Sequence, residues 1–336
     1  MRVNRCVVLA SRPSGAPRER DFRIEARPLA DPAQGQILCR NLFVSLDAGF
    51  RNWMDEGSGD DVLPAMRLDE PVMGLTVGRV LESRHPEYRA GDLLMARFAW
   101  EEFTVSDAGD FISRLPAHTD QPLSYYLGVL GDTGLSAYFG LMDYGRVVPG
   151  ETVVVSAAGG AVGSIAGQIA RILGARAVGI CGGAAKAARL VHELGYDATI
   201  DRSGGDLEHA VRAACPRGID VYFDNVGGPL LEVMLDHINE DARILLCGSV
   251  ATYNEPEPPP GPRNLFQLTK RRAHMHGFMT HLQLPRYDEA RQVLTGWIET
   301  GRLIVPEYRL HGIESVPQAF CDLFRGANFG KTVVEL

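Results

Sequence analysis

The segment Ser156–Ser164 reads S-A-A-G-G-A-V-G-S and consists almost entirely of residues with small side chains. Its core, Ala158-Gly159-Gly160-Ala161-Val162-Gly163, matches the pattern G-x-G-x-x-G except that Ala158 stands in the first glycine position. Small residues at the start of a helix let backbone N–H groups approach a pyrophosphate. The segment is therefore a candidate phosphate-binding loop, although any tight junction between a strand and a helix also favours Gly and Ala.

The next stretch of chain indicates which dinucleotide would bind. A site for NAD places Asp or Glu about 20 residues further on, where it accepts hydrogen bonds from the ribose. Here the chain reads V-G-I-C-G-G-A-A-K over Val178–Lys186, without a carboxylate. Gly182 and Gly183 leave room for a 2′-phosphate, and Lys186 and Arg202 are cations that would attract one. The pattern favours NADP(H) over NAD or S-adenosylmethionine, although Lys186 alone could be an exposed helix lysine.

These residues need a scaffold of buried strands followed by helices. Thr152–Ser156 is a continuous run typical of a strand buried on both faces, and Ser164–Leu173 has the apolar spacing of a helix. Further strands are expected at Arg176–Ile180, Ala198–Asp201, Val221–Asn225, Ala242–Cys247 and His274–Thr280, and further helices at Ala184–Leu194, Leu207–Cys215, Leu230–Ile238, Asn264–Arg272 and Tyr287–Thr300. This alternation predicts a doubly wound parallel sheet, the Rossmann architecture.

The two ends of the chain predict a second domain that is rich in short strands. Apolar runs separated by Gly, Pro and Asp occur at Gln36–Val44, Met73–Glu82, Asp92–Phe98 and Glu102–Val105. Such a series indicates a distorted β-barrel. Leu123–Met142 is longer and more helical, Pro256–Pro262 is a stiff connector, and Leu303–Leu336 returns to short strands and one helix. We expect one domain over residues 1–122 and 298–336, with a dinucleotide-binding domain inserted at 123–297.

Composition indicates a soluble globular enzyme. The 336 residues carry a net charge of −8, with 45% hydrophobic and 23% charged residues. An acidic chain is a poor partner for nucleic acid, and no apolar stretch approaches the roughly 18 residues that a membrane span needs. The cysteines, Cys6, Cys39, Cys181, Cys215, Cys247 and Cys321, are widely spaced, as in a protein with reduced thiols. We therefore expect a cytoplasmic enzyme without a nucleic-acid or membrane partner.

Several motifs occur in an order that is typical of one enzyme family. They include L-A-S-R-P at Leu9–Pro13, G-L-S-A-Y-F-G at Gly134–Gly140, Y-F-D-N-V-G-G at Tyr222–Gly228, Cys247-Gly248 with Tyr253-Asn254, and N-F-G-K-T at Asn328–Thr332. From end to end the chain resembles the medium-chain dehydrogenase/reductase superfamily, and within it the zinc-free, NADPH-dependent alkenal and enone reductases of the prostaglandin reductase and curcumin reductase group. The resemblance implies a GroES-like barrel domain beside the Rossmann domain, and a homodimer formed through the sheet edge near His274–Thr280.

The resemblance also implies residue roles. The implied cofactor-binding residues are Gly160, Ala161, Val162 and Gly163 at the pyrophosphate, Lys186 at the 2′-phosphate, Asn225, Cys247, Gly248, Ser249 and Tyr253 at the ribose and nicotinamide, Phe278, Met279 and Thr280 at the carboxamide, and Asn328 from the other domain; Arg202 is added here for its charge. Relatives usually have Tyr in place of Arg202. They often carry Pro-Tyr-Met between Asp47 and Arg51, so a substrate-side tyrosine is missing here at Gly49.

The available residue types favour reduction of an activated double bond. Neither the Cys/His/Glu set of a catalytic zinc site nor the four close cysteines of a structural site occurs in the sequence, so we expect no metal. An unactivated ketone is hard to reduce without a Lewis acid. Hydride from NADPH can instead add to the β-carbon of an α,β-unsaturated ketone or aldehyde, and hydrogen-bond donors stabilise the enolate. Tyr253 or water would then protonate the α-carbon, although the Tyr253 hydroxyl could merely bind ribose.

The small apolar substrate would need an apolar pocket. Phe50, Met73, Phe98 and Trp100 are candidates for its wall, and each would fit equally well in the core of the barrel. Two other functions remain open. One is an NADPH:quinone oxidoreductase of the same superfamily, and the other is a protein that binds NADPH without turnover.

Overall fold

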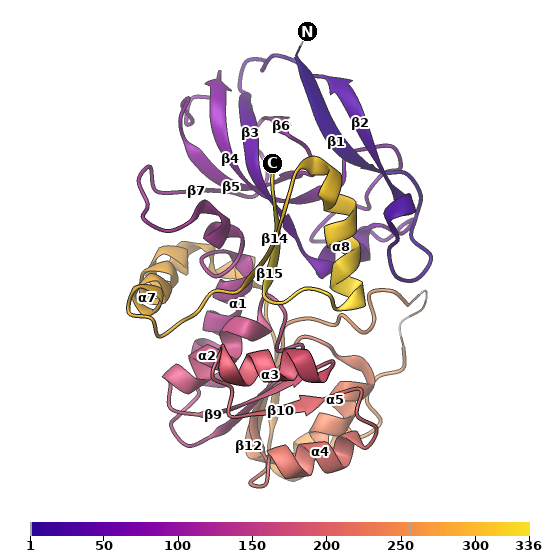
Figure 1. Ribbon diagram of the computed structural model, residues 1–336, viewed down its shortest axis with the longest axis vertical. Helices are drawn as coiled ribbons and strands as arrows, with labels where there is room; N and C mark the ends of the chain where they lie inside the picture. Colours follow the sequence, from indigo (N-terminus) through magenta and orange to yellow (C-terminus); the bar gives the residue numbers. More distant parts are fainter. Residues whose placement is uncertain (1, 256, 258) are drawn as a thin grey trace. The chain divides into compact units, whose positions relative to one another are not determined.

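The chain forms two compact units in a computed structural model that describes residues 2–255, 257 and 259–336. Unit 1 comprises the residues up to Leu127 together with Tyr308–Ala327 and Thr332–Leu336. Unit 2 comprises Gly128–Glu307 and the short segment Asn328–Lys331. Figure 1 traces the chain from its indigo N-terminus to its yellow C-terminus.

Unit 2 contains a six-stranded parallel sheet in the order β10-β9-β8-β11-β12-β13. The strands are β8 (Thr152–Val155), β9 (Arg176–Cys181), β10 (Ala198–Asp201), β11 (Ile219–Asp224), β12 (Ile238–Leu246) and β13 (His274–Gly277). The order reverses between β8 and β11, which is the Rossmann arrangement with its switch point at the first strand. The predicted doubly wound sheet is therefore confirmed.

Helices connect the strands of this sheet. They are α2 (Gly163–Ile172), α3 (Ala184–His192), α4 (Leu207–Ala214), α5 (Gly228–Leu235) and α6 (Phe266–Arg271). Because parallel crossovers are right-handed, α2 and α3 cover one face of the sheet, and the helices after β10 cover the other. One buried cluster supports this arrangement, since it joins Val211 of α4 and Met234 of α5 to Ile180 and Ile244 of the strands.

Two expected elements of unit 2 differ from the structure. The helical stretch expected at Leu123–Met142 is a 3-10 helix at Leu123–Leu127, then α1 (Asp132–Phe139), then a π-helical turn at Gly140–Gly145. Gly134 lies within α1, where a Cβ added to it would lie 2.0 Å from the carbonyl oxygen of Val129 in the turn before the helix. The strand expected to reach Thr280 ends at Gly277, and a 3-10 helix begins at Thr280.

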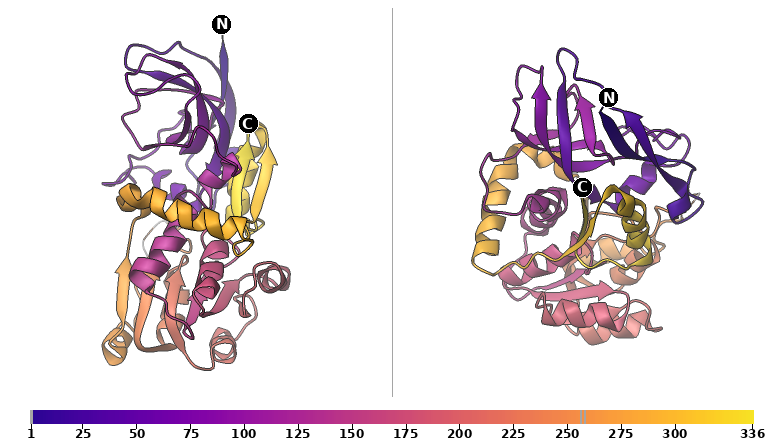
Figure 2. Two further views of the ribbon diagram at one scale, coloured as in Figure 1. Left: turned by 90° about the vertical axis from the view of Figure 1, so that its left-hand side faces the viewer. Right: turned by 45° about the horizontal axis from the view of Figure 1, so that its top comes forward.

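Unit 1 is antiparallel. A hairpin pairs β1 (Val3–Leu9) with β2 (Phe22–Pro28). A larger sheet has the order β14-β15-β3-β4-β5-β7, and β6 pairs with β3 outside this order. The strands of this sheet are β3 (Ile37–Leu46), β4 (Met73–Ser83), β5 (Leu93–Ala99), β6 (Phe103–Ser106), β7 (Ile112–Arg114), β14 (Glu307–His311) and β15 (Lys331–Glu335). Figure 2 shows the yellow C-terminal strands beside the purple strands that they extend. The predicted β-rich domain from both chain ends is present.

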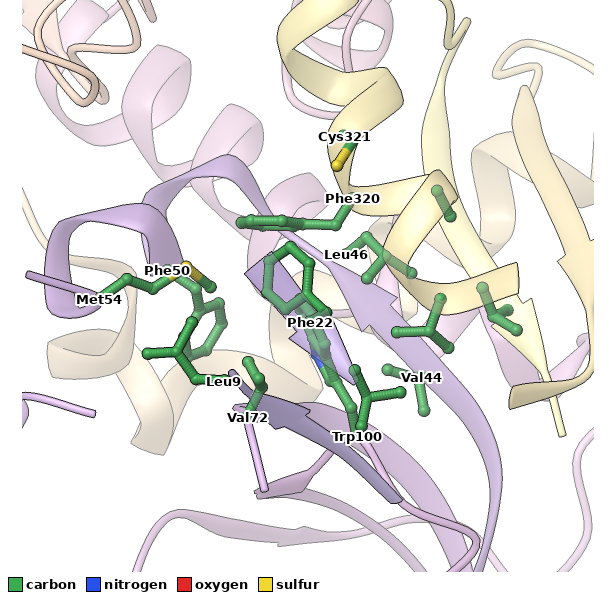
Figure 3. Close-up of a cluster of buried hydrophobic side chains, with 14 of the residues drawn as sticks. Leu9, Phe22, Val44, Leu46, Phe50, Met54, Val72, Trp100, Phe320 and Cys321 are labelled. Carbon is green, nitrogen blue, oxygen red and sulfur yellow. The ribbon is translucent and has the colours of Figure 1, made fainter. Parts of the chain in front are cut away.

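The core of unit 1 gathers side chains from distant parts of the sequence. Helix α8 (Val316–Arg325) places Phe320 against Phe22 and Trp100, with ring centroids 5.8 Å and 5.0 Å away. The three rings meet tilted or edge-on, and Figure 3 shows them together with the aliphatic side chains of Leu46 and Val72. Helix α7 (Tyr287–Glu299) belongs to unit 2. Within the described residues, no helix has both the length and the apolar character of a membrane span.

Unit 1 also holds a half-buried carboxylate whose ionisation should oppose folding. The Glu101 side chain accepts hydrogen bonds from Asn4 at 2.8 Å and from Thr104 at 2.7 Å. Burial nevertheless raises the pKa of Glu101, which means that the folded state holds this proton more tightly than the unfolded state. Protonated Glu101 therefore stabilises the folded state at low pH, and this contribution to the free energy of unfolding is lost as the pH rises through the folded-state pKa.

We expect Glu101→Gln to remove this pH dependence. Urea unfolding of both proteins at several pH values between 4 and 8 would show wild type losing stability relative to Glu101→Gln as the pH rises. Glu102→Gln is the matched control, because its hydrogen bond with Arg5 lowers the pKa of Glu102 and the trend should reverse. A wild-type advantage over Glu101→Gln that grows with pH would contradict the expectation.

Candidate active site

The small-residue segment forms a tight turn from β8 into α2, as expected. A Cβ added to Gly163 would lie 2.4 Å from the carbonyl oxygen of Ala157 and 2.7 Å from Cα of Ala158, so only glycine fits at the first position of α2. Ala157 itself has φ of +47°. The predicted phosphate-contacting residues follow along this turn: Gly160, Ala161 and Val162 are partly exposed, and Gly163 is buried.

Ala158 stands in the first glycine position of the G-x-G-x-x-G pattern, and its methyl group fits because Gly179 of the neighbouring strand β9 has no side chain. Ala158 is fully buried, and its methyl group lies 2.9 Å from the point where a Cβ on Gly179 would stand. Beneath the loop, the Tyr196 hydroxyl donates a 2.6 Å hydrogen bond to the carbonyl oxygen of Gly163. A Cβ on Gly167 would lie 1.9 Å from the Tyr196 ring. Our sequence analysis missed Tyr196, although the glycines around it mark the space that its ring needs.

A distant segment of chain lies against the phosphate loop. Gly330 donates from its backbone N–H to the carbonyl oxygen of Gly159 at 2.8 Å. The Phe329 ring lies 3.5 Å from the point where a Cβ on Gly159 would stand, and the Arg189 guanidinium lies 3.8 Å from the centre of that ring. Asn328 is buried and donates to the carbonyl oxygen of Gly330 at 3.1 Å. Asn328 thus lies near the loop as part of unit 2, whereas the predicted domain boundaries assign it to the other domain.

Two cations converge beside the same loop. Cδ of Lys186 lies 3.4 Å from the point where a Cβ on Gly159 would stand, and Nε of Arg202 lies 3.5 Å from the corresponding point on Gly182. Burial lowers the pKa of Lys186, and the charge of Arg202 contributes to the shift. Within the described part of the chain, neither side chain has an ion pair or a hydrogen bond to another side chain. Their charges are therefore available to an anion, as expected for a 2′-phosphate site.

A carboxylate beside this site is held by the backbone. Asp201, the last residue of β10, accepts hydrogen bonds from the N–H groups of Gly183 at 3.1 Å and Ser203 at 2.9 Å. These hydrogen bonds lower the pKa of Asp201, so it is ionised at neutral pH. Its charge stabilises the turn after β9. Gly182 and Gly183 have no side chains, so the position of the usual ribose-binding acid is without a carboxylate.

At the switch point, Asn225 is fixed by Ser156, the residue that directly follows β8. Its backbone N–H donates to the Ser156 hydroxyl and its side chain donates to the Ser156 carbonyl oxygen, both at 2.8 Å. The Ser156 hydroxyl in turn donates to the fully buried Asp224 carboxylate at 2.9 Å, as does the Tyr222 hydroxyl. The sequence motif contained Asp224, but its role as the anchor of these groups became evident only from the fold.

Tyr253 belongs to the loop that follows β12. Its hydroxyl oxygen accepts a 3.0 Å hydrogen bond from the backbone N–H of Ser249 and lies 3.3 Å from the point where a Cβ on Gly248 would stand. Burial raises the pKa of Tyr253 and, more strongly, that of Cys247, which reaches about 12. Both groups are therefore protonated at neutral pH. Because the Tyr253 oxygen accepts from the backbone, its own O–H bond can donate elsewhere.

The predicted carboxamide-holding segment follows β13. The Phe278 ring stacks on Tyr144 at 5.1 Å between centroids and meets Phe223 edge-on at 6.3 Å. Thr280 is buried, whereas the Met279 side chain between them is exposed. The segment is therefore fixed at both ends, which is suitable for presenting backbone groups to a ligand.

The four apolar candidates lie in unit 1 but in different surroundings. Trp100 is fully buried and Phe50 nearly so, and both belong to the cluster in Figure 3, with Met73 packed against it. Phe98 belongs to a separate cluster with Cys39 and Leu94. In the structure Trp100 packs as a core residue of unit 1. A role for the four residues in substrate binding stays a prediction.

Metal-ligating side chains are dispersed in the structure. Among the described residues, no group of three or more His, Cys, Asp or Glu side chains is placed so that it could hold a metal ion. All six cysteines are free thiols, and five of them are buried.

Comparison with known proteins places the chain in a family. Family models match residues 5–113, described as the N-terminal domain of oxidoreductase, and residues 161–295, described as zinc-binding dehydrogenase. The chain is 40% identical to an NADPH-dependent curcumin reductase of Escherichia coli, over 99% of this chain and 97% of the relative. It is 35% identical to an NADP(+)-dependent 2-alkenal reductase of Nicotiana tabacum, over 98% and 97%.

A solved structure has the same fold. CurA from Vibrio vulnificus, in complex with NADPH, matches with a TM-score of 0.90 and 38% identity over 98% of each chain. The identities extend over the full length of both units and are well above the level at which only the fold would be shared. The chain therefore belongs to the medium-chain dehydrogenase/reductase family, in the group that contains the curcumin and alkenal reductases.

Proposed function

We propose that this protein uses NADPH to reduce the carbon–carbon double bond of α,β-unsaturated ketones and aldehydes. The observation that carries the proposal is the 40% identity, over 99% of the chain, to an NADPH-dependent curcumin reductase. The geometry of unit 2 agrees with it. The narrow turn at Gly163 leaves room for a pyrophosphate, and Lys186 and Arg202 provide the charge for a 2′-phosphate.

The residues of unit 2 would hold the cofactor at several points. The loop Gly160–Gly163 would donate backbone N–H groups to the pyrophosphate, and Asn225 with Cys247–Ser249 would line the ribose and nicotinamide. The backbone of Phe278–Thr280 would bind the carboxamide, and Asn328 would close the pyrophosphate side. Bound NADPH supplies a hydride for the β-carbon of the substrate.

We propose Tyr253 as the donor of the second hydrogen. Its raised pKa keeps the hydroxyl protonated, and its oxygen is oriented by the Ser249 N–H, so that the O–H can donate a proton to the α-carbon. The electron pair of the enolate forms the new C–H bond, and Tyr253 regains its proton from solvent. Neighbouring hydrogen-bond donors stabilise the enolate oxygen before that step.

A panel of substrates tests the function. NADPH consumption should be observed with enones and alkenals, and the product should carry a saturated bond beside an intact carbonyl. Turnover with quinones alone would instead support the quinone oxidoreductase alternative. Tight NADPH binding without turnover of any enone, alkenal or quinone would support the non-catalytic alternative and overturn the proposal.

Tyr253→Phe should lower kcat about 100-fold while the Kd for NADPH changes less than about threefold, because general acid catalysis supplies about this factor. Stopped-flow rates and fluorescence titration would measure the two quantities. Tyr308→Phe is a control for the loss of a bonded tyrosine hydroxyl, since Tyr308 donates to Asp322 in unit 1. A raised Kd for NADPH with an unchanged kcat would show that Tyr253 only binds ribose.

We further propose a cytoplasmic homodimer. The thiols of all six cysteines are free, as expected in a reducing compartment. In the six-stranded sheet, β13 is an edge strand, and edge strands offer backbone groups for pairing with another chain. Light scattering at micromolar concentration would give the oligomeric state.

A further inference from the structure

The motif Gly134–Gly140 has no role in the function proposed above, and the structure places most of it on α1. A Cβ added to Gly140, directly after α1, would lie 2.9 Å from the Phe278 ring and 2.6 Å from that of Phe223. Glycine is therefore required there for Phe278 to occupy its position between Tyr144 and Phe223. One end of the motif thus supports the start of the segment Phe278–Thr280.

Ser136, one helical turn earlier on α1, supports the other end of that segment. The Ser136 and Thr280 hydroxyls are hydrogen-bonded to each other, and both side chains are buried. This hydrogen bond therefore connects α1 with the start of the 3-10 helix that follows β13.

We propose that Ser136 is a positioning residue for the nicotinamide end of NADPH. Its hydroxyl fixes Thr280 relative to α1, and it thereby sets the backbone groups of Phe278–Thr280 at the distance that a carboxamide requires. This inference rests on the proposed function, because it assumes that the cofactor lies across the carboxyl ends of these strands. The adenine end, beside Lys186 and Arg202, is outside the reach of Ser136.

The variant Ser136→Ala distinguishes the binding contribution of the nicotinamide end of the cofactor from that of the adenine end. We expect the Kd for NADPH to rise about 10-fold, the typical effect of leaving buried hydrogen-bonding groups without a partner. The Kd for 2′,5′-ADP, which lacks the nicotinamide, should change less than about twofold. Isothermal titration measures both constants without turnover. The deuterium isotope effect on hydride transfer should also increase, because a poorly placed ring slows that step.

Two further sets of variants control the result. Thr152→Val removes a buried hydroxyl from the opposite end of the sheet and should leave both Kd values unchanged. Thr280→Ser retains the hydroxyl that pairs with Ser136 and should therefore weaken NADPH binding less than Thr280→Val does. Thr280→Val should reproduce Ser136→Ala. The double variant should be no worse than either single one, because both remove the same hydrogen bond.

An equal loss of affinity for NADPH and 2′,5′-ADP in Ser136→Ala would overturn the proposal, as would unchanged NADPH binding in both Ser136→Ala and Thr280→Val. If Ser136→Ala fails to fold, the Thr280→Val and Thr280→Ser pair decides the question by the same comparison. Failure of the proposed function would look different, because wild type would then either not bind NADPH or leave every enone unreduced.

Discussion

Lys186→Ala is expected to raise the Kd for NADPH about 100-fold and to leave the Kd for NADH within about twofold. The loss corresponds to roughly 3 kcal/mol, the upper range for one hydrogen bond between a cation and a charged acceptor. NADH lacks the 2′-phosphate, so Lys186 has no phosphate group to bind in that complex. Fluorescence titration with both dinucleotides measures the ratio directly.

The effect should be large because Lys186 is already positioned. Its side chain lies over Gly159 of the phosphate loop, half-buried on the first turn of α3, and its aliphatic part is fixed there before any ligand arrives. Arg202 comes from the adjacent strand end and should contribute less, because its side chain is exposed. We expect Arg202→Ala to weaken NADPH about 10-fold, again with little effect on NADH.

The same lysine gives NADPH binding a pH dependence. Burial is the main cause that lowers the pKa of Lys186, and the charges of Arg202 and Arg189 add to it. Lys186 therefore loses its charge at a lower pH than an exposed lysine, and affinity for NADPH should fall as the pH rises through that lowered pKa. NADH binding should show no such change. Lys186→Arg, which stays charged, should flatten the NADPH profile.

Lys270→Ala is the matched control for these measurements. Lys270 lies on α6 of the same unit with its charge near the Phe266 ring, and its removal should not alter binding of either dinucleotide. An equal loss of NADPH and NADH affinity in Lys186→Ala would contradict a phosphate role. It would point instead to a lysine that supports the loop itself.

Periodicity was sufficient to predict the architecture of unit 2. The strand Ala198–Asp201 has the expected bounds, and the other predicted strands and helices of the sheet occur within a few residues of their expected places. Strand–helix alternation is a local pattern and is visible in sequence. The hairpin β1–β2 was not anticipated, because β2 is mostly exposed and carries an ion-pair ladder of Arg23, Glu25 and Arg27 in place of an apolar face.

The candidate site residues differ in the same way. Gly163, Lys186 and Asn225 could be proposed from the sequence because they belong to short motifs. Tyr196 and Ser136 could not, because each acts on residues far along the chain: Tyr196 supports Gly163, and Ser136 meets Thr280. Such contacts depend on how helices pack on the sheet, which no local pattern specifies. Gly167 and Gly179 lie within a helix and a strand, where no turn requires glycine. They show in the sequence that another side chain, here the Tyr196 ring, packs against the backbone at these positions.

Gly163→Ala should weaken NADPH and NADH alike, by about 100-fold or more, in contrast to the selective loss in Lys186→Ala. The added methyl group would meet the backbone of Ala157 and Ala158 at 2.4 to 2.9 Å, and backbone atoms cannot move aside as a flexible side chain can. The turn must therefore open, and the N–H groups that would face the pyrophosphate move with it. Because both dinucleotides share the pyrophosphate, both should be affected.

Stability should fall as well, by about 1 to 3 kcal/mol, the usual range for an overpacked core position. Gly296→Ala is the control: Gly296 lies within α7 with no atom within 4 Å of the added methyl group, so this change should stabilise the protein by about 1 kcal/mol through helix propensity. Urea unfolding and titration with both dinucleotides distinguish the outcomes. A Gly163→Ala protein that is less stable but binds both dinucleotides normally would show that the tight turn serves only the packing of α2 against β8.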